Sequence, residues 1–260
     1  MRFIIFVLVI YSTSLFSKDP SNYKNLFEEP PLRVLFVGNS YFYYNDSLHN
    51  HVRRMVEETF PDKKESLEFK SATIGGSRLS HHNIDHLLSY KNLSVSQPFQ
   101  VVILQGSSGE VLDAKSRRQF KIQSKRLINK IKKTGAIPVL YMIHAYVEPH
   151  ENYDPNMINQ IIDVYEKSGS ENNTLVFPVG IAFKNAYSLK PSIQLHKDFD
   201  GTHPDILGTY LSACVVFATL YKKDPTRLDY DYYGEIDSSD AKLLQDVAKE
   251  TVEKYFDITL

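Results

Sequence analysis

The sequence has little cysteine, little net charge and no long hydrophobic run. Cys214 is the only cysteine among 260 residues, so no intrachain disulfide can form and the fold must rest on its core. This cysteine lies in an apolar helical pattern, which indicates a buried and unreactive thiol. Lys and Arg total 30 against 31 Asp and Glu, so the totals predict no basic face and do not indicate a nucleic-acid partner.

The first residues carry a positive charge and continue as an apolar run. Arg2 precedes apolar residues 3–10, and small polar residues follow. The run is too short to span a bilayer, which takes about 20 apolar residues. We therefore expect a signal peptide at residues 1–17, a linker or arm at 18–31, and export to the periplasm or the medium without stable membrane insertion. Because no Ala-x-Ala cleavage site stands out, an uncleaved N-terminal anchor is the alternative.

The rest of the chain alternates between strand-like and helix-like segments. A composition of 42% hydrophobic and 23% charged residues suits one globular domain, and no repeat is present. The alternation favours a parallel sheet with helices on both faces. Continuous apolar runs predict buried strands, and apolar residues three and four apart predict helices. The predicted strands are 34–37, 67–73, 101–104, 137–143 and 175–179, and the predicted helices are 48–59, 84–90, 117–133, 157–167, 206–221 and 241–256.

Small polar residues and glycines follow three of the first four predicted strands. In a parallel sheet, ligands bind outside the carboxyl ends of the strands, so the active site is expected at this edge. The segments found there are Gly38-Asn39-Ser40, Gly75-Gly76-Ser77, Gln105-Gly106-Ser107-Ser108-Gly109 and, after the fourth strand, His144.

Ser40 is the best-placed candidate nucleophile, since Gly38 lets the backbone turn sharply after the first strand. A serine hydroxyl needs a base that takes its proton and a third group that orients the base. Asp200 and His203 stand three residues apart in a predicted turn and could supply both.

Each of these residues also has a structural interpretation. Ser40 could cap a helix or form a turn, and Asp200 and His203 could belong to a loop that caps the helix beginning near Ile206. Phe42 occupies the final glycine position of Gly-x-Ser-x-Gly, so the nucleophile elbow of the α/β-hydrolases is not predicted.

Together, four ordered segments resemble the sequence blocks of the SGNH/GDSL hydrolases, over about residues 33–221. The last segment is the most specific, and residues 195–214 closely resemble a poorly characterised bacterial branch of that family. The segments that carry the resemblance are Gly38-Asn39-Ser40, Gly75-Gly76, Gly106-Ser107-Ser108 and Asp200-Gly201-Thr202-His203.

The resemblance implies a flavodoxin-like α/β fold over residues 32–260, a three-layer α/β/α sandwich with about five parallel strands. It further implies ester hydrolysis through a serine acyl-enzyme, with no cofactor and no metal. Ser40 would attack the ester carbonyl, His203 would act as base and then acid, and Asp200 would orient His203. The backbone N–H groups of Ser40 and Gly76 would stabilise the oxyanion, with a third donor from the block after the third strand.

Two positions depart from the family pattern. Asn39 replaces the usual aspartate before the serine, which we interpret as a mild change. Gly106-Ser107-Ser108 replaces Gly-x-Asn, so the usual amide donor is missing. Gln105 or Ser108 could replace it, and we favour Gln105 because an amide N–H reaches further.

Several histidines have competing interpretations. His81, His82 and His86 have spacings compatible with a zinc pair, but no third ligand is evident and solvated helix histidines are the simpler interpretation. His144 could contact substrate at the cleft or could be a polar cap on a strand end.

The leading hypothesis is an exported carbohydrate esterase that removes short acyl groups such as acetyl from a small-molecule or glycan ester. One alternative is acyl transfer to a sugar by the same triad. Another is a catalytically silent glycan-binding domain, and a third is a metal-dependent hydrolase using the His81 and His82 region with Asp200 and His203. The oligomeric state is not predicted.

Overall fold

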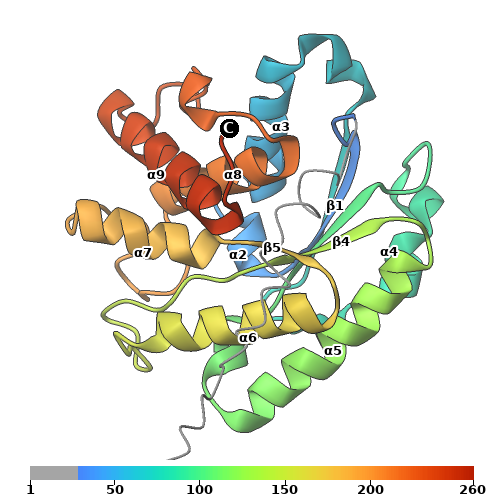
Figure 1. Ribbon diagram of the computed structural model, residues 1–260, viewed down its shortest axis with the longest axis horizontal. Helices are drawn as coiled ribbons and strands as arrows, with labels where there is room; N and C mark the ends of the chain where they lie inside the picture. Colours follow the sequence, from blue (N-terminus) through green and yellow to red (C-terminus); the bar gives the residue numbers. More distant parts are fainter. Residues whose placement is uncertain (1–28) are drawn as a thin grey trace, which may run out of the picture.

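The structure is a computed structural model that describes residues 29–260. The predicted signal peptide at 1–17 and most of the predicted arm at 18–31 lie outside the described residues. Five parallel strands form one sheet in the order β2-β1-β3-β4-β5, as Figure 1 shows in part. The strands are β1 (Arg33–Gly38), β2 (Glu68–Thr73), β3 (Val101–Gln105), β4 (Ile137–Tyr141) and β5 (Leu175–Phe177).

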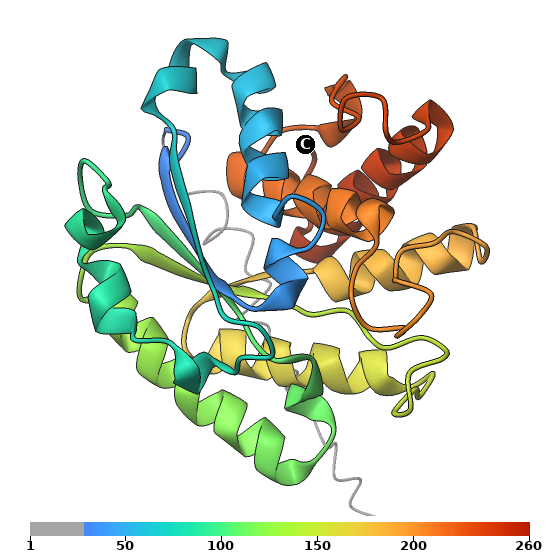
Figure 2. The ribbon, with the colours of Figure 1, turned by 180° about the vertical axis from the view of Figure 1, so that it is seen from behind.

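Helices cover both faces of this sheet (Figures 1 and 2). One layer contains α3 (Leu48–Thr59), α7 (Val179–Leu189), α8 (Ile206–Tyr221) and α9 (Ser238–Phe256), and the other contains α4 (Ile84–Leu88), α5 (Ala114–Lys132) and α6 (Met157–Glu171). Short helices fill the connections: α2 (Ser40–Tyr43), η2 (Pro61–Ser66), η3 (Leu79–His81), η4 (Tyr90–Leu93), η5 (Ser108–Val111) and η6 (Pro225–Arg227). The predicted three-layer α/β/α sandwich is confirmed.

The core lies on both faces of the central strands. Residues 34–37 of β1 and 101–104 of β3 are fully buried, as the continuous apolar runs predict. Helix α8 is buried over almost its whole length, because it packs between the sheet and α3, α7 and α9. Cys214 lies in α8 with no exposed surface, and burial raises the pKa of its thiol, so it is an inert core residue.

The predicted ends of two strands are wrong. β4 ends at Tyr141 rather than at 143, and β5 ends at Phe177, after which α7 begins at Val179. Helix α7 was not predicted, because the apolar run of β5 continues into it without a break. Gly180 marks the junction, because a Cβ there would lie 2.2 Å from the carbonyl oxygen of Ile143. Among the described residues, no helix is long and apolar enough to cross a membrane.

Candidate active site

The site lies at the carboxyl ends of β1 and β3, the neighbouring strands at which the strand order reverses. The chain leaves β1 at Gly38 and enters α2 through Asn39, whose side chain caps the helix by accepting from the N–H of Tyr41. Ser40 is therefore the first helical residue, and its own hydroxyl is not used as a cap. Its N–H belongs to the first turn, where no intrahelical acceptor exists.

Ser40, His203 and Asp200 form a hydrogen-bonded chain. Oγ of Ser40 lies 2.8 Å from Nε2 of His203, and Nδ1 of His203 lies 2.5 Å from Oδ2 of Asp200. The chain therefore brings together residues 163 positions apart in the sequence. A carboxylate at Nδ1 holds the proton there, which leaves Nε2 able to accept a proton from Ser40.

The carboxylate of Asp200 is held by the turn that contains it. Its Oδ1 accepts from the backbone N–H groups of Thr202 at 2.9 Å and His203 at 3.1 Å. Burial would raise the pKa of Asp200, but the hydrogen bonds from Thr202 and His203 outweigh it and hold the pKa below its usual value. Asp200 is thus charged and is fixed in position beside His203.

The turn that carries Asp200 and His203 is anchored on both sides. Gly201 has a φ of +62°, and its carbonyl accepts from Val147 N–H at 2.9 Å. Helix α8, which follows the turn, is capped by Asp205. The alternative interpretation of Asp200 and His203 as cap residues is therefore unnecessary, because another residue caps the helix.

Two aromatic side chains that the sequence analysis missed contact the chain of Ser40, His203 and Asp200. The ring of Tyr44 stacks on His203 with 4.4 Å between centroids. Tyr41 meets His203 edge-on, and its hydroxyl lies 2.6 Å from Oγ1 of Thr202. Neither has a spacing or motif signal, because both contacts depend on the long-range approach of α2 to the 200–203 turn.

Gln105, the favoured third oxyanion donor, is not placed for that role. Its side chain is 1% exposed, with Oε1 accepting from Asn39 N–H at 2.8 Å and Nε2 donating to the carbonyl of Gly106. Both ends of the amide are thus bound to backbone. The prediction was wrong because the reach of an amide matters less than which backbone groups surround it.

Ser108 is the other candidate for the third donor. It begins η5 and is half-buried, and its hydroxyl interacts with those of Tyr41 and Tyr146. A hydroxyl facing two other hydroxyls can turn its proton toward a ligand. Gly76 has a φ of +64° and lies exposed in the turn after β2, where a glycine is favoured.

His144 does not contact the cleft surface. It has no exposed area and is stacked between the rings of Tyr41 and Phe183, each with 4.4 Å between centroids. Its Nδ1 lies 2.9 Å from Nε2 of His196. The substrate-contact prediction is therefore wrong, because β4 ends before this residue and the chain carries it into the core.

The three histidines after the second strand point to different partners. His82 is buried, with Nε2 3.0 Å from Oγ of Ser77, and His86 Nδ1 lies 3.1 Å from Asn92 Nδ2. His81 accepts from the N–H of Arg78 at 3.3 Å. Between residues 29 and 260, no group of three His, Cys, Asp or Glu side chains could hold a metal ion. His82 is also not the solvated histidine we expected, since it supports the 75–77 turn.

A pocket of about 540 Å³ is lined by residues that follow β4 and by residues of α7, and Ser40, Asp200 and His203 are not part of its lining. Its wall includes Val147, which is hydrogen-bonded to Gly201 in the turn that carries Asp200 and His203. The pocket combines aromatic rings with charged groups, from Tyr146, Tyr153, Phe183, Tyr187, Glu148, Asp154 and Lys184.

No protein-family model and no curated relative matches this chain. Solved structures do match its fold. A DUF4886 family protein from Bacteroides uniformis is 19% identical with a TM-score of 0.67, over 88% of this chain and 97% of that one. A protein assigned as an SGNH hydrolase from Slackia heliotrinireducens is 20% identical with a TM-score of 0.59, over 73% and 98%. An acetyl xylan esterase is 20% identical with a TM-score of 0.56, over 72% and 98%. The chain thus has the α/β/α fold of SGNH hydrolases.

Proposed function

We propose that this protein is an SGNH-type serine esterase. One observation carries the proposal: the continuous hydrogen-bonded chain from Ser40 through His203 to Asp200. It stands at the edge of the sheet where ligands bind in such folds. The fold shared with an acetyl xylan esterase supports it.

The reaction follows from this geometry. Oγ of Ser40 attacks the ester carbonyl carbon while its proton passes to Nε2 of His203, and Asp200 stabilises the imidazolium. The oxyanion accepts hydrogen bonds from the N–H groups of Ser40 and Gly76 and from the hydroxyl of Ser108. The carbon–oxygen bond to the alcohol then breaks, and His203 protonates the alcohol. Water repeats the sequence on the acyl-enzyme and releases the acid.

A short acyl group on a carbohydrate is the substrate class that we propose. The pocket lined by residues after β4 and by α7 has aromatic rings for stacking against sugar faces and carboxylates for sugar hydroxyls, at Tyr153, Glu148 and Asp154. The wall of the pocket is joined to the 200–203 turn by the hydrogen bond from Val147 N–H to the carbonyl of Gly201. A sugar held there would present a neighbouring ester to the triad.

Export remains part of the proposal, on the strength of the N-terminal pattern alone. Intact-mass measurement of protein recovered outside the cytoplasm would show loss of about residues 1–17. Recovery of the full-length chain in the membrane fraction would favour the uncleaved anchor instead.

The test measures hydrolysis of p-nitrophenyl acetate and of acetylated xylo-oligosaccharides. Ser40→Ala should lower kcat at least about 10⁴-fold, because no other nucleophile replaces the serine. Ser47→Ala is the matched control, since Oγ of Ser47 also lies 2.8 Å from a histidine, Nδ1 of His49. Burial lowers the pKa of His49 to about 4. The activity of the Ser47→Ala variant should match that of the wild type.

Other outcomes identify the alternatives. Equal turnover by wild type and Ser40→Ala would overturn the proposal, and no turnover with retained glycan binding would indicate a silent binding domain. Activity that vanishes with a chelator and survives an organophosphonate would indicate a metal hydrolase. Acyl transfer is recognised by adding a sugar acceptor and detecting acylated sugar instead of free acid.

A further inference from the structure

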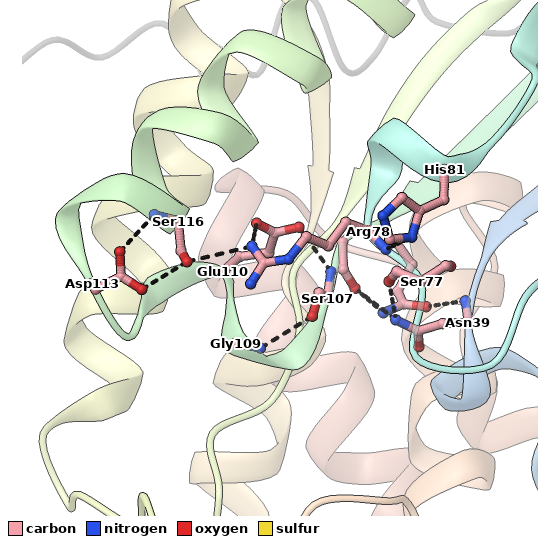
Figure 3. Close-up of polar contacts among 11 residues, drawn as sticks. Asn39, Ser77, Arg78, His81, Ser107, Gly109, Glu110, Asp113 and Ser116 are labelled. Carbon is pink, nitrogen blue, oxygen red and sulfur yellow. Dashed lines mark hydrogen bonds and ion pairs between the residues drawn. The ribbon is translucent and has the colours of Figure 1, made fainter.

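Asn39 joins three segments that are far apart in the sequence. Its Nδ2 donates to the carbonyl oxygen of Ser77 at 3.0 Å and to that of Gly106 at 3.4 Å, while its backbone N–H donates to Gln105. The side chain is 4% exposed. Figure 3 shows Asn39 beside Ser77. One amide therefore connects the start of α2 with the segment after β2 and the segment after β3.

The orientation of this amide is determined by its surroundings. Nδ2 faces two carbonyl oxygens, which only accept, and Oδ1 faces the N–H of Tyr41, which only donates. An ionised carboxylate has no donor and would set a negative charge against both carbonyls. The aspartate that SGNH hydrolases usually carry at this position is thus incompatible with these partners, and the change to asparagine is not mild.

The surrounding residues are matched to the asparagine. Oε1 of Gln105 reaches Asn39 N–H only because Gly38 lacks a side chain, since a Cβ there would lie 2.4 Å from that oxygen. A second link joins the same segments further out, as Figure 3 shows: Arg78 extends to Glu110 at 3.4 Å, and Glu110 accepts from Ser107 N–H at 3.1 Å.

We infer that Asn39 is a positioning residue that sets the distance between the two oxyanion segments, those of Gly76 and Ser108. This inference rests on the proposed esterase function. Asn39 does not touch the substrate; it acts through the carbonyls of Ser77 and Gly106, which adjoin the donor-bearing segments. Donor placement affects the transition state far more than the bound ester.

The experiment compares two asparagine-to-aspartate changes at helix N-caps. Asn83 caps α4 by accepting from His86 N–H at 3.3 Å and is exposed, so Asn83→Asp keeps its only role. Asn39→Asp keeps the cap but loses the amide donors, since a carboxyl can donate one hydrogen bond when protonated and none when ionised. We expect Asn39→Asp to lower kcat about 10²-fold, as small misplacements do, with KM changed less than about threefold. Asn83→Asp should match the wild type.

A stability measurement tests the same inference without activity. Burial and the two facing carbonyl oxygens would disfavour the charged form of the introduced carboxyl and so raise its pKa. The carboxyl would therefore keep its proton in the folded state. The folded state then binds more protons than the unfolded state, so the Tm of Asn39→Asp should fall as pH rises from 5 to 8, relative to that of Asn83→Asp. If the wild type is no esterase but this shift occurs, the proposed function fails, whereas the link that Asn39 makes between the two segments is supported.

Asn39→Ser provides a variant without the charge. Its hydroxyl can cap α2 but is too short to link the two carbonyls. We expect it to fold and to show the same selective loss of kcat. Wild-type kcat in either Asn39→Asp or Asn39→Ser, or a pH-independent Tm difference in Asn39→Asp, would overturn the inference.

Discussion

The polar side chains of this site divide into those that bind one another and those that bind the backbone. Asp200 and Gln105 bind backbone N–H groups, whereas Ser40 and His203 bind each other through side-chain atoms. The difference lies in the neighbours of each side chain and not in its chemical type. Gln105 carries the amide that would suit an oxyanion, yet both ends of this amide are hydrogen-bonded to the backbone of Asn39 and Gly106.

Ser108 and Gln105 can be separated by mutation. Ser108→Ala should lower kcat about 10²-fold to 10³-fold at nearly wild-type stability, because it removes one proposed donor from the transition state. Gln105→Ala should instead lower the free energy of unfolding by about 1–3 kcal/mol, because it leaves the buried Asn39 N–H without an acceptor. Kinetics and urea unfolding of both variants provide the measurement. Full activity of Ser108→Ala would contradict the assignment.

Helix α8 packs against the segment that leads to the turn of Asp200 and His203. Gly208 lies in its first turn against the backbone of Leu195, where the segment leading to Asp200 begins. A Cβ at Gly208 would lie 2.1 Å from the Leu195 carbonyl oxygen. That oxygen also accepts from Asp205 N–H at 2.9 Å, so helix and turn share one close backbone contact.

Gly208→Ala should therefore destabilise the protein. Alanine is the better helix former by about 1 kcal/mol, but the close contact forces the turn and α8 apart, and overpacking of this kind costs about 1–3 kcal/mol. We expect a lower urea midpoint together with lower kcat. Gly109→Ala is the control for stability, since a Cβ there would make an ordinary 3.4 Å contact with Leu112. A higher urea midpoint for Gly208→Ala would contradict this prediction, because it would show that the turn accommodates the methyl group without loss of stability.

At the scale of the whole molecule, the core buries titratable rings. Burial lowers the pKa of His196 to about 4 and holds the pKa of His144 well below its usual value. Both rings are neutral in the folded state and pack beneath the catalytic turn, with Tyr187 hydrogen-bonded to His196 at 2.7 Å. His144 and His196 thus stay unprotonated in the folded state, whereas in the unfolded chain both would take up a proton near pH 6.5.

The free energy of unfolding should consequently fall between pH 7 and pH 5. In that range the unfolded state binds more protons than the folded state, so stability decreases as pH decreases. With a pKa of about 4, His196 alone contributes up to about 2 kcal/mol of the loss. Urea unfolding at both pH values measures it, and His196→Asn should show a smaller difference. An identical pH dependence in the variant would contradict this origin.

The sequence alone determined the layers and the strands of this protein. Buried strands on both faces require continuous apolar runs, and those runs identified all five strands, with the largest errors where an apolar run passed into α7 or beyond β4. The order of residue types also pointed to Ser40, Asp200 and His203, because a triad needs a nucleophile, a base and an orienting acid. The structure places these three in hydrogen-bond contact.

Only the tertiary structure decided the roles of Asn39, Gln105 and His144. Each depends on backbone groups or rings brought close by strand pairing, such as Ser77 and Gly106 around Asn39. A hydrogen bond consumes a donor only when its acceptor is within about 3.5 Å, and that distance is not encoded in the spacing of residues along the chain. The chemistry available at the site was therefore readable from the sequence, whereas the choice of which atoms remain free for substrate was not.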